Sequence, residues 1–193
     1  MDYVIDKIEK LFISKNIEIE DIELFRFGLS KLLANIIVIT IIVVISATLH
    51  TILPTLGILV SLLFLRSKTG GYHFDNSTKC FLFSVAMPLV VGWVSVSVAV
   101  PKTLLLIACM LASILTMMLA PIDHPNKRLS NSEKNYFKKK TIVSMAILYF
   151  VILISEVLLP TYEISKFIEI GILTNFISMI FTLIKNHCQR ENR

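Results

Sequence analysis

The sequence predicts an all-α integral membrane protein with about six transmembrane helices, and three observations support this fold class. Hydrophobic residues make up 55% of the 193 residues and charged residues only 17%, whereas soluble domains carry about a quarter charged residues. Six apolar stretches approach or reach the roughly 20 residues that an α-helix needs to cross a membrane. Lys and Arg gather between these stretches, as is typical of the loops that join membrane spans.

The N-terminal segment, residues 1–28, is predicted to be amphipathic. Apolar residues from Val4 to Phe12 recur at helical spacing, with acidic and basic residues between them. This pattern indicates a helix that lies on the membrane surface, and a helix packed on the protein's own loops fits it equally well. The segment lacks the basic and apolar regions of a cleaved signal peptide, so the first span is expected to direct insertion.

The predicted spans follow one another with short connections. They cover residues 29–49, 52–65, 81–100, 103–120, 141–159 and 167–184. The second is the weakest, because a helix over residues 52–65 rises only about 21 Å against a hydrocarbon layer of roughly 30 Å. With Pro54 near its start, this span is expected to tilt into a thinned region or to be partly re-entrant.

The distribution of Lys and Arg predicts which side each loop faces. Short cytoplasmic loops accumulate these residues, and short external loops do not. With six crossings and a cytoplasmic N-terminus, only Lys102 and Lys166 fall outside the cell. We therefore expect both termini in the cytoplasm (N-in and C-in). No linker or internal repeat divides residues 1–193, which are expected to form a single membrane domain.

Residues 66–80, between the second and third spans, concentrate reactive side chains. His73 and Cys80 place an imidazole and a thiol in one short segment at the membrane surface, and nearby cations favour the nucleophilic thiolate. Seven residues of straight helix would separate the two side chains by about 10.5 Å. We therefore expect an irregular turn at Gly70 and Gly71, followed by a helix that begins near Cys80. The glycine amides and Arg66 are candidates for stabilising an oxyanion, and either Asp75 or Asn76 could orient the imidazole.

This segment resembles the accessory gene regulator B (AgrB) peptidases of Gram-positive quorum sensing. The family pattern of Arg, then Gly-Gly-x-His, then Cys seven residues later is met by Arg66, Gly70, Gly71, His73 and Cys80. A Pro-x-Asp followed by basic residues after the fourth apolar stretch is similar to a second family hallmark and covers residues 121–128 here. Length and hydropathy are similar throughout, so the resemblance extends over essentially the whole chain.

The resemblance implies a cysteine endopeptidase in the bacterial cell membrane, with its active site on the cytoplasmic side. Its substrate would be an AgrD-like propeptide with an amphipathic leader, a central signal that contains a Cys, and an acidic tail. Cys80 would attack the carbonyl that ends the signal, and His73 would act as general base and then protonate the leaving amine. The resulting acyl-thioester would exchange with the substrate's own Cys and give a thiolactone. The resemblance also implies a homodimer.

The loop from 121 to 140 is strongly basic and is a candidate binding site for the acidic tail. Its cations could instead fix the topology and contact membrane lipid phosphates, and the two roles are compatible. The residues predicted to bind the substrate are Lys127, Arg128, Lys138, Lys139 and Lys140.

Other patterns favour neither a metal nor another cofactor. The three cysteines contain no CxxC spacing, and the four histidines have no helical pairing typical of a metal site. The net charge of +5 does not indicate nucleic-acid binding, because the cations lie between apolar stretches rather than along one face.

A different class of function remains open from the sequence alone. Glu156 is expected deep in the fifth span, where it would line a polar groove or stay neutral against a neighbouring helix. A small transporter or exporter of a peptide or ion would use such a residue. A non-catalytic membrane adaptor is the third possibility.

Overall fold

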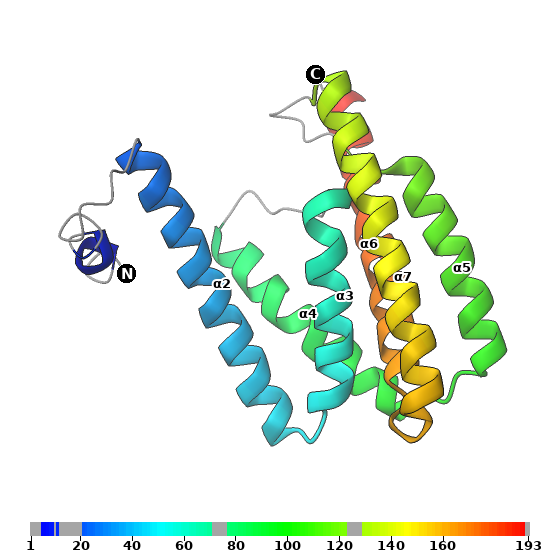
Figure 1. The fold of residues 1–193 in the computed structure, drawn as a ribbon. Coiled ribbons are helices and arrows are strands. Elements are labelled where there is room, and N and C mark those ends of the chain that lie inside the picture. The colour runs from blue at the N-terminus through cyan, green and yellow to red at the C-terminus, as the bar shows by residue number, and fades with distance from the viewer. Residues whose placement is uncertain (1–4, 10, 12–20, 71–76, 123–128, 192–193) are drawn as a thin grey trace.

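The computed structural model describes residues 5–9, 11, 21–70, 77–122 and 129–191. The described residues form helices and short connections and contain no strand, which confirms the predicted all-α class. The long helices, with one short 3₁₀ turn at Pro160–Tyr162, are α2 (Ile22–Thr48), α3 (Ile52–Thr69), α4 (Ser77–Ser97), α5 (Lys102–Leu119), α6 (Asn131–Leu158) and α7 (Ile164–Glu191) (Figure 1).

These six helices are long and apolar enough to cross a membrane, as expected for a multi-pass membrane protein. Each overlaps one predicted span, but several begin or end farther out. The second span illustrates the difference, because α3 has 18 residues and therefore a length of about 27 Å, close to the hydrocarbon thickness. Its last turn contains Arg66 and Lys68, which an apolar pattern alone leaves outside the helix.

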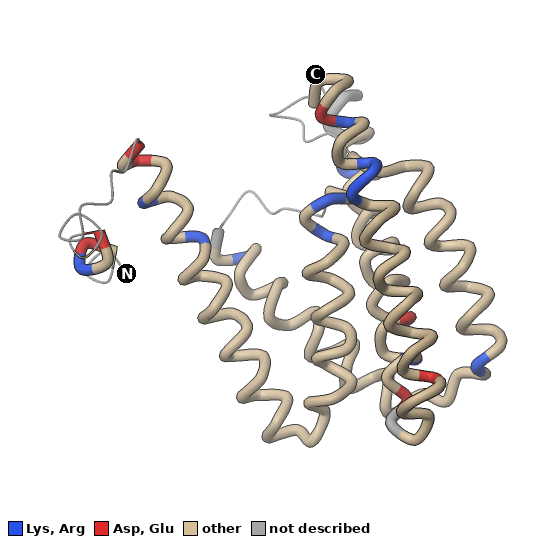
Figure 2. The backbone as a smooth tube through the Cα atoms, viewed as in Figure 1, with Lys and Arg blue, Asp and Glu red and all other residues tan. Residues whose placement is uncertain are grey.

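Successive long helices alternate in direction (Figure 1). The starts of α2, α4 and α6 and the ends of α3, α5 and α7 therefore lie at one end of the molecule, which we call the basic end. Figure 2 shows Lys and Arg gathered there, over the end of α3 and the starts of α4 and α6. Lys102 and Lys166 lie at the starts of α5 and α7, at the opposite end. The arrangement agrees with six alternating crossings, while the cytoplasmic orientation of both termini stays a prediction.

Helix α3 lies at the centre of the fold. It packs most extensively on α7 and also contacts α4, α6 and α2. Small residues allow the close approach to α7: a Cβ on Gly171 would lie 2.5 Å from the Cβ of Ser61. The Ser61 hydroxyl donates to the carbonyl of Ile168 at 3.1 Å. Small and hydroxyl-bearing residues at such an interface are typical of helix packing in membranes. Apolar side chains alone do not hold two helices together there, because they contact lipid equally well.

Two apolar clusters complete the packing. One joins α3, α5, α6 and α7, and the other joins α2, α3 and α4 through Ile42, Leu59 and Leu89. The larger cluster consists of Leu65, Cys109, Met145, Leu148, Ile152, Ile168 and Ile172. Leu65 and Cys109 are fully buried, so the larger cluster packs on α3 immediately before its last turn.

The described part of the N-terminal segment contacts the start of α2. Residues 5–9 are helical, and Ile5 is buried. Arg26 on α2 pairs with Asp6 at 2.8 Å and with Glu9 at 2.6 Å. These contacts agree with a helix that packs on the protein, and its expected place on the membrane surface stays a prediction.

Candidate functional site

Cys80 and Arg66 lie at the ends of consecutive helices, at the basic end (Figure 1). Cys80 lies in the first turn of α4 and Arg66 in the last turn of α3, and both are half-buried. They are close enough to interact electrostatically. The predicted helix start near Cys80 is confirmed, because α4 begins at Ser77. Gly71 and His73 lie outside the described residues, as do Asp75 and Asn76.

Gly70 ends α3 in a conformation and a location that both require glycine. Its φ of +78° is disfavoured for residues with a side chain, and glycine is the usual residue just past a helix end. A Cβ at this position would also lie 2.8 Å from the carbonyl oxygen of Ile122. Gly70 therefore ends the helix as glycine commonly does, while the irregular turn predicted over Gly70 and Gly71 extends beyond the described residues and stays a prediction.

The two sequence motifs meet at this point. The backbone N–H of Ile122 donates to the carbonyl of Thr69 at 3.0 Å and satisfies one of the carbonyls that a helix end leaves without an internal partner. The start of the second motif, Pro121 and Ile122, therefore docks on the end of α3. Asp123, Lys127 and Arg128 lie outside the described residues.

Thr69 and Asn175 were not predicted from the sequence. The Asn175 side chain on α7 donates from Nδ2 to Thr69 Oγ1 at 3.4 Å, and Thr69 Oγ1 donates to the carbonyl of Leu65 at 3.1 Å. Thr69 is 0% exposed and Asn175 2%. The available signal was an amide inside the sixth apolar stretch, because polar side chains in spanning helices are costly and often functional.

Three of the predicted substrate-binding residues, Lys138, Lys139 and Lys140, lie on a helix rather than in a loop. Ser130 and Glu133 form a capping box that starts α6, so the second half of the 121–140 segment is helical. Lys138, Lys139 and Lys140 are exposed.

These lysines extend toward the end of α3. The ammonium of Lys140 lies 4.4 Å from the ring centroid of Tyr136, and it is close enough to Lys68 on α3 for electrostatic repulsion. The structure therefore brings like charges together a short distance from Arg66. Such an arrangement favours an anionic partner.

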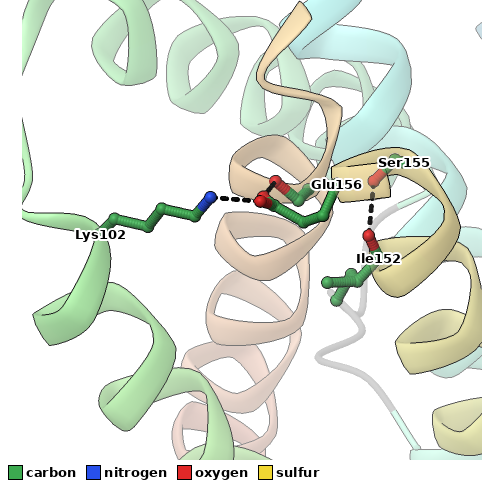
Figure 3. A network of polar contacts seen from close by, with 5 residues as sticks. Lys102, Ile152, Ser155 and Glu156 are labelled. Atoms are coloured by element: carbon green, nitrogen blue, oxygen red, sulfur yellow. Dashed lines mark hydrogen bonds and ion pairs between the residues drawn. The ribbon is translucent and has the colours of Figure 1, made fainter. Parts of the chain in front are cut away.

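Glu156 lies at the other end of the molecule, in the last turn of α6 rather than deep within a span. It forms an ion pair with Lys102 on α5 and accepts a hydrogen bond from Ser165 on α7 (Figure 3). The expectation of a neutral carboxyl or an open polar groove is corrected, because this carboxylate joins three helix ends. A transporter that uses Glu156 loses its main support.

The described residues hold no group of three or more His, Cys, Asp and Glu residues that could bind a metal. The three cysteines are free thiols, of which Cys109 is buried and Cys188 exposed. Cys80 is half-buried, lies at a helix start at the basic end, and interacts electrostatically with Arg66. The arrangement can therefore supply a nucleophile with a nearby positive charge.

Comparison with known proteins identifies a family and a relative. Residues 2–183 match the family described as Accessory gene regulator B. A curated protein from Staphylococcus aureus (strain bovine RF122 / ET3-1), Accessory gene regulator protein B, is 23% identical over 184 residues. That alignment covers 93% of this chain and 96% of the relative. No solved structure matches the chain.

Proposed function

The chain belongs to the accessory gene regulator B family, and from this premise we propose that it is a membrane cysteine endopeptidase of a quorum-sensing system. Its substrate is a propeptide whose acidic C-terminal tail is removed. The observation that carries the proposal is the placement of Cys80 in the first turn of α4 and of Arg66 in the last turn of α3, two helix ends that both lie at the basic end (Figure 1). A helix N-terminus and a neighbouring cation are the surroundings in which nucleophilic cysteines are typically found.

The first half of the reaction forms an acyl-enzyme. His73 takes the proton of Cys80, and the sulfur attacks the carbonyl carbon that ends the signal part of the propeptide. Arg66 and the backbone amides at Gly70 and Gly71 stabilise the negative oxygen of the tetrahedral intermediate. Collapse breaks the C–N bond, the tail amine takes the proton from His73, and a thioester on Cys80 remains.

The second half of the reaction closes the ring. The thiol of the Cys within the signal loses its proton to His73, and its sulfur attacks the thioester carbonyl. Cys80 leaves as a thiolate and recovers the proton. One thioester replaces another at little net free-energy change, so the cyclic thiolactone forms only where water is kept from the acyl-enzyme. A site at the membrane surface supports that exclusion.

The acidic tail of the substrate binds the basic end. Lys138, Lys139 and Lys140 are exposed on α6. Lys140 lies close to Lys68, which shares the last turn of α3 with Arg66. Lys127 and Arg128 extend the same basic stretch in sequence. Negative charge from the tail relieves the repulsion among these cations, and lipid phosphates compete for the same surface.

The active site faces the cytoplasm, and the active protein is a homodimer. The concentration of Lys and Arg at the basic end, where Cys80 also lies, supports the proposed orientation. Helix α2 has few buried residues, so it offers an apolar surface to lipid or to a second copy of the chain.

A cleavage assay tests the proposed function. The purified protein is reconstituted in lipid vesicles with a propeptide that carries an acidic tail, and release of the tail is measured by mass spectrometry. Cys80→Ala should abolish release. Cys188→Ala is the matched control, because it removes an exposed thiol near the C-terminal end of α7, and it should leave release unchanged. Equal activity of wild type and Cys80→Ala would contradict the proposal.

A further inference from the structure

We propose that Thr69 and Asn175 are positioning residues that hold the last turn of α3, and therefore Arg66, in place beside Cys80. With Gly70 and Ile122 they form what we call the α3 clasp. The role in catalysis rests on the proposed function. The contacts themselves rest on the geometry described above.

The α3 clasp joins three segments that are far apart in the sequence. Asn175 on α7 donates to the Thr69 hydroxyl at 3.4 Å, and the N–H of Ile122 donates to the Thr69 carbonyl at 3.0 Å. Gly70 then lies against the carbonyl of Ile122, where a Cβ has no room. The side chain and the carbonyl of Thr69 are thus held from two directions.

Burial makes this arrangement unusual for a membrane helix. Thr69 and Asn175 are both almost completely enclosed, and an amide removed from water costs free energy unless it is hydrogen-bonded. An aliphatic residue at position 175 would avoid that cost. The Asn175 amide is therefore explained by its hydrogen bond to Thr69, which holds the end of the helix that carries Arg66.

The last turn of a helix frays when its carbonyls lack partners. Arg66 precedes Thr69 by three residues, so the two lie in the same final turn. If the α3 clasp is released, this turn loosens and the guanidinium moves away from Cys80. Displacement of a catalytic group by about 1 Å can lower a rate by about a hundredfold.

Thr69→Val and Asn175→Leu test this role, because each removes the polar contact and keeps approximately the same volume. In the propeptide assay we expect each to lower kcat by about 10- to 100-fold, while KM stays within about twofold because the exposed lysines of α6 are untouched. The double variant should be no slower than the slower single variant, because both substitutions remove the same hydrogen bond. Thr69→Ser keeps the hydroxyl and should restore most of kcat.

Ser61→Ala is the matched control. Ser61 is also buried on α3, and its hydroxyl also bonds to α7, but it lies about 12 Å along the helix from Thr69. A structural effect common to all α3–α7 bonds would lower kcat to a similar extent in Ser61→Ala and Thr69→Val. That outcome, or a Thr69→Val enzyme with the wild-type kcat, would overturn the proposal.

A second readout does not depend on peptidase activity. Alkylation of Cys80 by iodoacetamide, followed by mass spectrometry of its peptide, reports the local environment of the thiolate. We expect severalfold slower alkylation in Thr69→Val and no change in Ser61→Ala. If the wild type cleaves no propeptide but this difference is found, the proposed function fails and the positioning role stands. If cleavage depends on Cys80 but both readouts are unchanged in Thr69→Val, only the positioning role fails.

Discussion

Gly70 is the residue at which backbone conformation and packing impose the same requirement. Its φ of +78° disfavours any L side chain, and the Ile122 carbonyl occupies the space that a Cβ would need. Holding a residue with a side chain in such a conformation costs about 1–3 kcal/mol of stability, and the clash with Ile122 adds to this cost. The glycine therefore allows α3 to end where the second motif docks.

Gly70→Ala should lower both the thermal midpoint of unfolding and the cleavage rate, the latter by at least about tenfold, because relief of the clash displaces Ile122 or the end of α3. Gly28→Ala is the control. Gly28 lies on α2, and no packing atom lies within 4 Å of the place that a methyl group would occupy, so alanine there should be neutral or slightly stabilising. Equal effects of the two substitutions in a thermal shift and cleavage assay would contradict this account.

The sequence predicts part of the candidate site. Arg66, Gly70 and Cys80 are identified by their side-chain or backbone chemistry and by the resemblance to the family pattern, and the structure places Arg66 and Cys80 at the ends of consecutive helices. Asn175 is not predicted in this way, because its partner Thr69 lies 106 residues away in the sequence. A hydrogen bond between distant helices leaves no periodic pattern in either one.

At the scale of the helices, hydropathy predicts the spans but not their ends. Apolar stretches identify all six, because lipid requires about 20 apolar residues in each. The C-terminal end of α3 and the start of α6 are mostly polar. Residues 66–69 and 131–140 are helical there although they lie outside the apolar stretches. Capping by Ser130 and docking of Ile122 determine those ends, and both depend on individual hydrogen bonds.

The first turns of α6 are expected to control substrate affinity. Replacing Lys138, Lys139 and Lys140 together with Gln should raise KM for a propeptide with an acidic tail by about tenfold, at roughly 0.5 kcal/mol per exposed charge. The value of kcat should stay the same, because the change leaves the Cys80 environment intact. Added salt should raise KM of the wild type more than that of the variant. If KM of the variant is unchanged at low salt, these lysines do not bind the substrate and instead serve topology or lipid contact.

Glu156 joins the end of α6 to the start of α5 through its ion pair with Lys102, and to the start of α7 through the hydrogen bond from Ser165. Glu156→Gln should lower the thermal midpoint in lipid or detergent and leave propeptide cleavage within about twofold, because the pair is distant from Cys80. Lys102→Gln should have a similar effect, and the double variant should be less destabilised than the sum of the two. Loss of cleavage or of peptide export with normal stability would instead favour the transporter hypothesis.

At the scale of the whole molecule, helix direction and charge point to the same orientation. The alternation of six helices places Cys80 and most cations at the basic end, with Lys102 and Lys166 opposite. The rule that cytoplasmic loops are positive predicts that the basic end faces the cytoplasm. The proposed function requires this orientation, because its propeptide substrate would be made in the cytoplasm.

Cysteine labelling tests this orientation. In a background without the three native cysteines, Ser132→Cys lies at the basic end and Thr161→Cys in the opposite connection, and both positions are exposed. A membrane-impermeant maleimide added to intact cells should label Thr161→Cys and should label Ser132→Cys only after lysis. The reverse pattern would place Cys80 outside the cell and would contradict the proposed function.

The central claim is that Cys80 carries the acyl group of the substrate between cleavage and ring closure. The most direct measurement is rapid quenching of the reconstituted protein with a propeptide whose internal Cys is replaced by Ser, followed by mass spectrometry of the digested enzyme. We predict a thioester adduct on Cys80 that hydroxylamine removes and that Cys80→Ala lacks. An adduct on Cys109 or Cys188, or tail release from wild type without any adduct, would contradict the account.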